Sequence, residues 1–152
     1  MKNIIICGFE KVGKTHIVNN PELDWLNSIE LDKNEYDENY YPKNIIHSLE
    51  EKLNENFNFI FLPSDKKIRK RLKEDGYFYF LVYPDIMLEN EYTRRNQNIP
   101  IKAFNKKVMS CRNENYEQCY HIRLVRPSAS LATVIIDMYD NFSKYYEKHN
   151  II

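Results

Sequence analysis

The sequence predicts a single α/β domain with a mostly parallel five-stranded sheet, and three observations carry the prediction. Five short segments rich in β-branched and aromatic residues recur along the 152 residues, at 4–7, 25–32, 57–62, 77–83 and 120–125. Helical patterns separate most of them, which favours parallel strands joined by crossover helices. The first segment also runs into a glycine-bounded loop. The length fits one domain.

That loop reads G-x-x-x-x-G-K-T without a mismatch. In such a loop the backbone N–H groups wrap a phosphate chain, the lysine reaches the β- and γ-phosphates, and the hydroxyl binds Mg²⁺. The positive end of the following helix adds to the attraction. A plain turn would not account for the lysine and threonine after the second glycine. We therefore predict a phosphate site formed by Gly8, Phe9, Glu10, Lys11, Val12, Gly13, Lys14 and Thr15, with Lys14 catalytic and Thr15 a metal ligand.

Helical spacing marks the segments between the other strands. A stripe of Ile45, Ile46, Leu49 and Leu53 follows Tyr41-Pro42. A helix at 65–75 ends at Gly76, and Asp85 can cap a helix that reaches Arg95. A polar segment is predicted from there to about Glu117. The last helix starts near Ser130 and has the most regular amphipathic pattern, with Leu131, Val134, Ile135, Met138, Phe142 and Tyr145.

Composition narrows the function classes. The chain has 22 basic and 22 acidic residues, so its formal net charge of zero argues against a globally basic nucleic-acid binder. No charged leader with a long apolar core begins the sequence, and no apolar run reaches the roughly 20 residues that span a bilayer. Cys7, Cys111 and Cys119 are odd in number and form no C-x-x-C, which indicates reduced thiols. We expect a cytoplasmic protein without a membrane partner.

Polar residues follow the ends of the predicted strands. Ligands of parallel α/β sheets bind at the carboxyl ends of the strands. The topology therefore places the loop and five further residues around one crevice. These residues are Asp32, Ser64, Asp65, Asp85 and Arg126. Asp32 stands out because it ends the predicted second strand, whereas most other acids of the stretch 22–38 fit a solvated face.

One acid-free segment concentrates positive charge between Glu91 and Glu114. It holds Arg94, Arg95, Lys102, Lys106, Lys107 and Arg112. Folded over the loop, it would neutralise charge on a transferring phosphoryl group, and arginine suits this role because its planar fork binds phosphate in a bidentate way. The alternatives are a solvated loop with incidental charge and a contact with nucleic-acid phosphates. A second basic run at 66–73 fits a solvated helix face.

The order of these parts resembles the P-loop nucleoside and nucleotide kinases of the adenylate and thymidylate kinase group, especially small phage-type members. The loop is the firmest part of the likeness. The second part is Leu81-Val82-Tyr83-Pro84, followed by Glu91-Tyr92 and Arg94-Arg95, and the third is the closing strand and helix at 120–146. The resemblance implies a P-loop NTPase three-layer sandwich over residues 1–152, with a lid-like segment at about 92–117.

By the same resemblance, Lys14 corresponds to the β/γ-phosphate lysine, Thr15 to the Mg²⁺ ligand and Asp32 to the acid near the acceptor. Arg94 and Arg95 correspond to the lid arginines. Two features depart from the family: Asn96-Gln97-Asn98 follows the arginines where glycine is common, and the third strand runs into Pro63-Ser64-Asp65 instead of ending in aspartate. A GTPase fits less well, because no D-x-x-G follows the third strand and Asn105-Lys106-Lys107-Val108 lacks the guanine-binding aspartate.

The sequence thus predicts a phosphotransferase that uses ATP and Mg²⁺ to phosphorylate a nucleoside or a nucleoside monophosphate. Two alternatives stay open. One is a nucleotide-binding interaction protein with weak catalysis, and the other is a polynucleotide end kinase that grips a strand through the basic segment.

Overall fold

The computed structural model describes residues 3–97, 99–117 and 119–141. Its centre is a five-stranded sheet in the order β2-β3-β1-β4-β5, and all four strand pairings are parallel. The strands are β1 (Ile4–Gly8), β2 (Ser28–Glu30), β3 (Phe59–Pro63), β4 (Tyr79–Pro84) and β5 (Cys119–Leu124). The prediction of an α/β fold with a parallel five-stranded sheet is confirmed.

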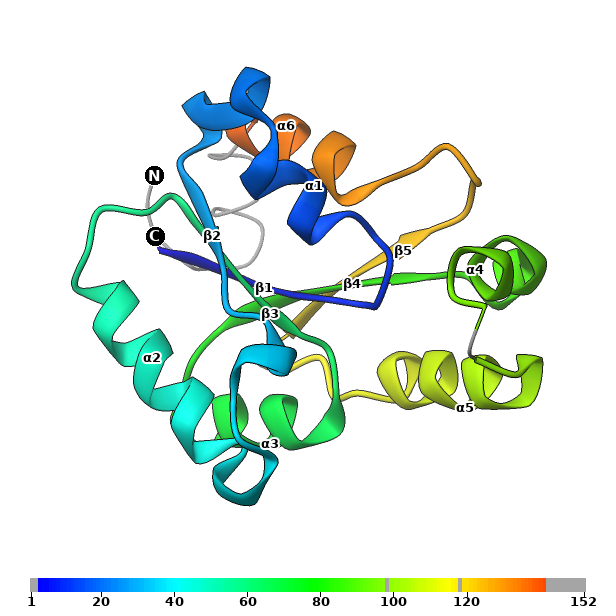
Figure 1. Cartoon of the computed structure of the whole chain (residues 1–152), viewed down its shortest axis with the longest axis horizontal. Helices are drawn as coiled ribbons and strands as arrows, with labels where there is room; N and C mark the ends of the chain where they lie inside the picture. Colours follow the sequence, from blue (N-terminus) through cyan, green and yellow to red (C-terminus); the bar gives the residue numbers. More distant parts are fainter. Residues whose placement is uncertain (1–2, 98, 118, 142–152) are drawn as a thin grey trace.

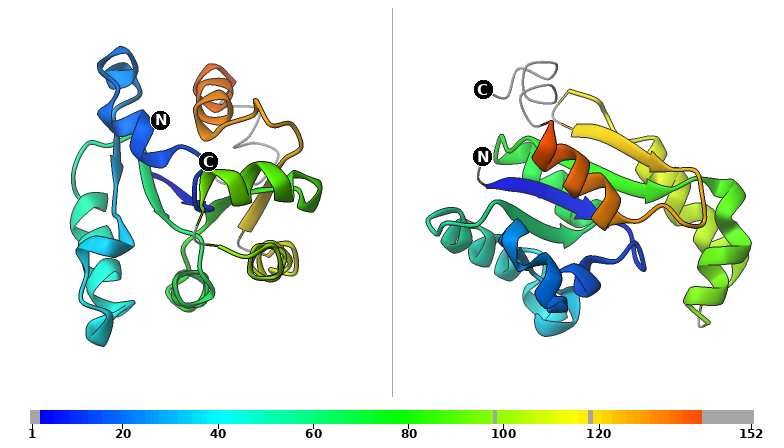
Figure 2. Two further views of the ribbon diagram at one scale, coloured as in Figure 1. Left: turned by 45° about the vertical axis from the view of Figure 1, so that its right-hand side comes forward. Right: turned by 90° about the horizontal axis from the view of Figure 1, so that it is seen from above.

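Helices cover both faces of this sheet (Figures 1 and 2). One face carries α1 (Lys14–Asn19) and α6 (Leu131–Asp140), and the other carries α2 (Lys43–Leu53), α3 (Lys66–Glu74) and α5 (Ile101–Arg112). The strand order explains the division. The chain first steps outward from β1 past β3 to β2 and then returns across the sheet, so crossovers of one hand lie on opposite faces. Short α4 (Glu89–Arg95) lies beyond the carboxyl end of β4.

The core lies on both faces of the central strands. Every residue of β1, β3 and β4 is buried, which explains why these strands read as continuous apolar runs. The predicted stripe of α2 buries Ile45, Ile46 and Leu49, and α6 buries Leu131, Ile135 and Met138. The predicted extension of that last helix through Phe142 and Tyr145 lies outside the described residues. None of the described helices is long and apolar enough to cross a membrane.

The second strand is shorter than predicted. The segment at 21–26, which includes the predicted strand residues Trp25 and Leu26, forms the 3₁₀ helix η1 (Pro21–Leu26). Proline at its first position and the Asn20 side chain, which accepts a hydrogen bond from Glu22 N, favour this start. Three residues remain to pair with β3. Asp32 therefore does not end the strand but caps a second 3₁₀ helix, η2 (Lys33–Glu35).

The polar segment predicted to reach about Glu117 is wrong over residues 101–112, where the chain forms the 12-residue helix α5. This helix buries Phe104, Val108 and Cys111, which lie at positions i, i+4 and i+7 of one face. Lys106 and Lys107, which lie between them in the sequence, are exposed. Lys102, Lys106, Lys107 and Arg112 of the basic segment therefore lie on a helix packed against β4 and α4, whereas Arg94 and Arg95 lie on α4 itself. Two further 3₁₀ turns, η3 (Glu38–Tyr40) and η4 (Ile86–Leu88), complete the described elements.

Candidate functional site: a cleft at the glycine-bounded loop

The two glycines of the loop are required for different reasons. Gly13 has φ 109° and ψ 23°, a left-handed conformation that side chains rarely adopt, and it turns the loop into α1. Gly8 has an ordinary backbone conformation, but its surroundings leave too little room for a Cβ atom. A Cβ atom there would lie 3.0 Å from Lys14 Cδ and 3.2 Å from Val12 Cγ2. Glycine at this position thus allows the Lys14 side chain to cross back over the end of β1.

Lys14 lies where the two central strands end. Its Nζ donates to Gly8 O at 2.6 Å and to Leu62 O at 3.5 Å, on β1 and β3. The chain leaves these neighbouring strands toward opposite faces of the sheet, which makes their carboxyl ends the expected ligand position. Burial lowers the pKa of Lys14, and the nearby Glu30 carboxylate opposes that shift. Neutral carbonyls hold this partly buried cation at the edge of the sheet.

Thr15 bonds to an acid that sequence reasoning did not single out. Its Oγ1 donates to Glu30 Oε1 at 2.7 Å. Glu30 is the last residue of β2, and it was predicted to belong to a solvated acidic face. The available signal was its position at a strand end, two residues before Asp32. The fold, by pairing β2 with β3, brings this strand end beside the start of α1.

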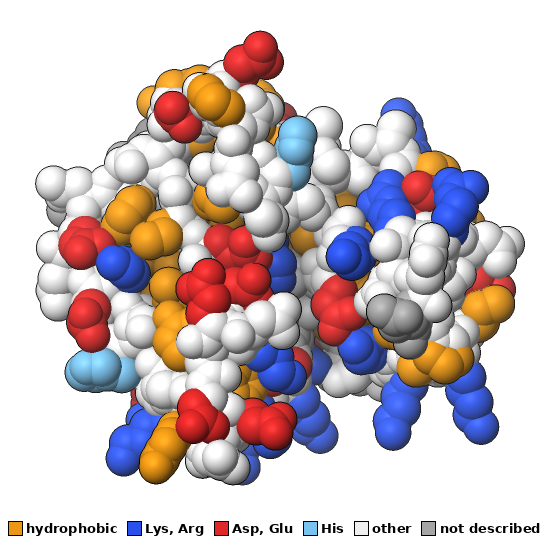
Figure 3. Space-filling view, in the orientation of Figure 1, with side chains coloured by type: hydrophobic (Ala, Val, Ile, Leu, Met, Phe, Trp, Pro, Cys, Tyr) orange, Lys and Arg blue, Asp and Glu red, His pale blue; other side chains and the backbone are white. Residues whose placement is uncertain are grey.

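The loop opens into a cleft of about 790 Å³. Its walls come from the loop, the end of β2 with η2, the β3–α3 junction, and α4 with α5. The residues that line it are Gly8, Phe9, Glu10, Lys11, Gly13, Lys14, Thr15, His16, Glu30, Asp32, Lys33, Asn34, Pro63, Ser64, Asp65, Lys66, Arg69, Asn96, Lys107, Ser110 and Cys111. Acidic side chains gather near the centre of the face seen in Figure 3, with lysines and arginines toward α4 and α5.

The predicted crevice is confirmed in part. Asp32, Ser64 and Asp65 line the cleft, as the strand-end argument predicted. Asp85 and Arg126 are not among its lining residues, so their placement was wrong. Asp85 instead caps η4 through Met87 N and pairs with Arg123 at 3.2 Å.

The two predicted lid arginines lie outside the lining of the cleft. Arg94 is paired with Glu91, and its side chain is 76% exposed. Arg95 supports the loop from its outer side: Nη1 donates to Lys11 O at 3.2 Å and Nη2 to Pro127 O at 2.8 Å. Its guanidinium also lies over the Tyr92 ring. The catalytic role of Arg94 and Arg95 stays a prediction.

Lys107 is the cation of the predicted basic segment that does line the cleft. Its Nζ donates to Glu10 Oε1 at 2.7 Å, and Asn96 Nδ2 donates to the other oxygen of the same carboxylate at 3.1 Å. Glu10 belongs to the loop. This carboxylate therefore joins the loop to α5 and to the end of α4, and it holds a lysine beside the expected phosphate position.

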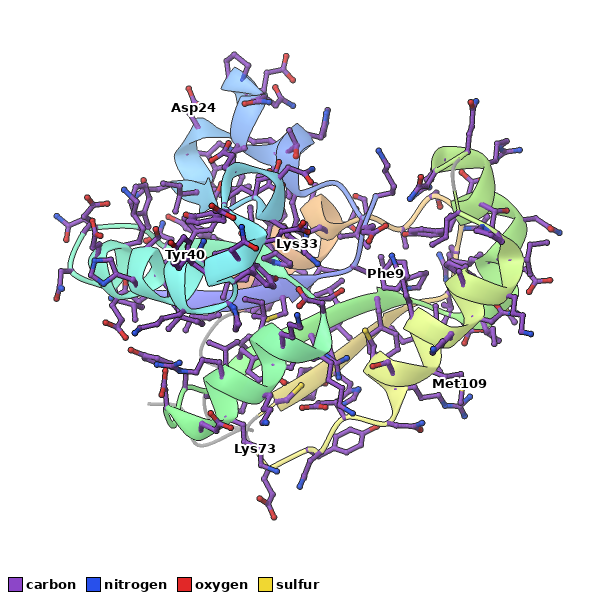
Figure 4. All side chains as sticks on the ribbon, turned by 60° about the horizontal axis from the view of Figure 1, so that its bottom comes forward. Phe9, Asp24, Lys33, Tyr40, Lys73 and Met109 are labelled. Atoms are coloured by element: carbon purple, nitrogen blue, oxygen red, sulfur yellow. The ribbon has the colours of Figure 1, made fainter. Side chains whose placement is uncertain are left out.

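The apolar residues of the loop anchor it to three helices. Phe9 packs edge-to-face on Tyr92 and Phe104, with ring centroids 6.2 and 5.7 Å apart, and it lies between the end of β1 and the α4–α5 pair in Figure 4. Val12 is buried, and its carbonyl accepts a hydrogen bond from Leu131 N at the start of α6. The side chains of Phe9 and Val12 thus contribute packing. Their backbone N–H groups donate to Val82 O and Phe9 O, and their place in the phosphate site stays a prediction.

One buried arginine connects two walls of the cleft, the β3–α3 junction and α5. Arg69 is 2% exposed, although the basic run at 66–73 was predicted to be a solvated face, and that prediction is wrong for this residue. Its guanidinium donates to Ser64 O, to Ser110 O and Oγ, and to Glu114 Oε2 at distances from 2.6 to 3.0 Å. Arg69 therefore ties the end of β3 to α5.

The acids of the cleft do not form a metal site by themselves: within the described part of the chain, no three His, Cys, Asp or Glu side chains gather to hold an ion. All three cysteines are free and buried. Fold and cleft together define an α/β protein with a parallel five-stranded sheet and a glycine-bounded loop at its carboxyl edge. No protein-family model, no curated protein and no solved structure matches the chain.

Proposed function

We propose that the protein binds ATP with Mg²⁺ in this cleft and transfers the γ-phosphoryl group to a nucleoside or nucleoside monophosphate. One observation carries the proposal: Lys14 and Thr15 of the glycine-bounded loop face a cleft that extends well past them. The volume of about 790 Å³ falls in the range of small-molecule sites, about 300 to 1,000 Å³. The strand order and the cleft support a P-loop NTPase sandwich, which is part of this proposal.

Each residue has a role that its position supports. The loop backbone and Lys14 bind the β- and γ-phosphates, and Lys107 supplies a second positive charge from α5. Thr15 would hold the Mg²⁺ that accompanies the nucleotide, and the ion would supply further positive charge to the phosphates. Asp32 lines the same cleft and accepts a proton from the acceptor hydroxyl if the acceptor is a nucleoside. A monophosphate acceptor needs no base, so positioning and charge stabilisation supply most of the rate.

The second candidate is a nucleotide-binding protein that does not transfer phosphate. The end of β3 favours it, because Pro63 and Ser64 occupy the place where an acid would support the metal. Asp65 follows, but its Oδ1 accepts a hydrogen bond from the Tyr41 hydroxyl at 2.6 Å. This carboxylate already has a partner in the wall of the cleft.

ADP release distinguishes the two candidates. The purified protein is incubated with ATP and Mg²⁺ and with a panel of nucleosides, nucleoside monophosphates and a 5′-hydroxyl oligonucleotide. The proposal expects ADP formation that depends on one acceptor class and is lost in Lys14→Ala. Tight ATP binding without acceptor-dependent ADP would support the second candidate, and phosphorylation of the oligonucleotide alone would indicate a polynucleotide kinase. Absence of nucleotide binding would refute all three.

A further inference from the structure

We propose that Glu30 is the second protein group, beside Thr15, that holds the Mg²⁺ of a bound nucleotide. The inference rests on the proposed function, because it concerns the metal of that same site. The third strand runs into Pro63-Ser64 and does not end in the aspartate that would support the metal. Glu30, at the end of β2, takes that role instead.

The contacts at the loop single out this carboxylate. The Thr15 hydroxyl donates a hydrogen bond to Glu30 Oε1 at 2.7 Å. Burial lowers the pKa of Lys14, and among the nearby charges the Glu30 carboxylate opposes that shift most strongly. One carboxylate thus lies beside both functional side chains of the loop. It is partly buried and lines the cleft.

The other acids of the cleft have different partners. Asp65 accepts a hydrogen bond from the Tyr41 hydroxyl, and Glu10 accepts hydrogen bonds from Lys107 and Asn96. Asp32 caps its own turn by accepting a hydrogen bond from Asn34 N at 3.0 Å. Glu30, in contrast, accepts its hydrogen bond from Thr15, the predicted metal ligand itself.

The donor chemistry fits Mg²⁺. This ion prefers oxygen ligands, keeps several waters and is held through one or two carboxylates together with substrate phosphates. A hydroxyl oxygen and a neighbouring carboxylate from the protein supply that set, and they explain why a cluster of three acids is not needed. Thr15 and Glu30 come from α1 and β2, two elements that pack against each other.

The charge of Glu30 should affect nucleotide affinity in opposite directions with and without a divalent cation. Without a divalent cation, a carboxylate close to Lys14 repels the phosphates of a nucleotide and weakens its binding. With the cation bound, the same carboxylate strengthens binding. Replacement of Glu30 by its neutral isostere should therefore act in opposite directions in the two conditions. A residue that only supports the fold of the loop would weaken binding in both.

The test measures the affinity of a fluorescent ADP analogue, in excess Mg²⁺ and in EDTA, for the wild-type chain and for four variants: Glu30→Gln, Glu30→Asp, Glu35→Gln and Asp32→Asn. For Glu30→Gln, we expect the Mg²⁺-dependent gain in affinity to fall by about tenfold or more, with equal or tighter binding in EDTA. Glu35→Gln is the matched control, since Glu35 is an exposed acid of η2 that does not line the cleft. Glu30→Asp keeps the charge and should retain part of the gain. Circular dichroism verifies that each variant is folded.

Three results would overturn the inference. The first is an unchanged Mg²⁺-dependent gain in Glu30→Gln, which would leave nucleotide binding itself intact. The second is an equal loss of affinity in Mg²⁺ and in EDTA, which indicates a structural role. The third is loss of the gain in Asp32→Asn but not in Glu30→Gln, which would transfer the role to Asp32. A wild-type chain that binds no ADP in either condition would refute the proposed function together with the inference.

Discussion

Replacement of Arg69 by methionine tests how the cleft wall is held together. The variant keeps an unbranched side chain but removes the donors to Ser64 O, Ser110 and Glu114. Arg69 is 2% exposed, and the side chain of Glu114 is 20% exposed, so the change leaves a largely buried carboxylate without its cation. Breaking a buried ion pair in this way costs about 3 to 5 kcal/mol. That is a large share of the roughly 5 to 15 kcal/mol that stabilise a domain, and it predicts a fall in Tm on the order of 10 °C.

Urea unfolding and thermal melts measure the loss. Arg71→Met is the matched control, because the Arg71–Asp75 pair lies at the C-terminal end of α3 and is partly exposed, with side chains 37% and 28% exposed. It should cost less than about 1 kcal/mol. The double variant Arg69→Met/Glu114→Gln should recover part of the stability lost in Arg69→Met, because a neutral amide then replaces the buried carboxylate that has no cation. Equal, small losses in Arg69→Met and Arg71→Met would show that Arg69 does not hold this wall.

Three further predictions concern the loop and the sheet edge. Lys107→Ala should lower acceptor-dependent turnover roughly a hundredfold, whereas Lys106→Ala, an exposed neighbour that does not line the cleft, should leave it unchanged; a steady-state ADP assay compares them. Arg95→Ala should weaken ATP binding through loss of its bond to Lys11 O, and Arg94→Ala should not, as calorimetry can show. Burial lowers the pKa of His121 below its usual 6.5, so the unfolded chain binds the proton more readily than the folded chain. The contribution of neutral His121 to the free energy of unfolding is therefore fully present above pH 6.5 and is lost as the pH falls below that value. In His121→Gln, unfolding between pH 7.5 and 5 should lose that decline, and an unchanged profile would contradict the argument.

The local sequence pattern was sufficient to predict the central strands of the sheet and the glycine-bounded loop. Apolar runs bounded by proline or glycine predicted the central strands, because parallel strands covered on both faces carry little polar sequence. The loop was predictable because its glycines, lysine and threonine are adjacent in the chain. The spacing of Phe104, Val108 and Cys111 fits a helix, but the prediction of a polar segment gave weight to the basic residues among them and overlooked that spacing.

Contacts between distant segments were not predictable in the same way. The burial of Arg69 depends on Ser110 and Glu114, which follow it by 41 and 45 residues. Thr15 meets Glu30 only because β2 pairs with β3 and α1 packs on β2. A helical run of lysines and arginines gives no local sign of which side chain will be buried, and an acidic stretch gives none of which carboxylate will face the loop.

The central claim is that the loop around Lys14 binds the phosphates of a nucleotide. Calorimetry of ATP and of adenosine, each with the wild-type chain and with Lys14→Ala, tests it most directly. A charge-assisted hydrogen bond contributes about 1.5 to 3 kcal/mol, so the variant should bind ATP at least about tenfold more weakly. Its affinity for adenosine, which has no phosphate, should be unchanged. An equal loss of both affinities, or ATP binding that does not depend on Lys14, would contradict the claim.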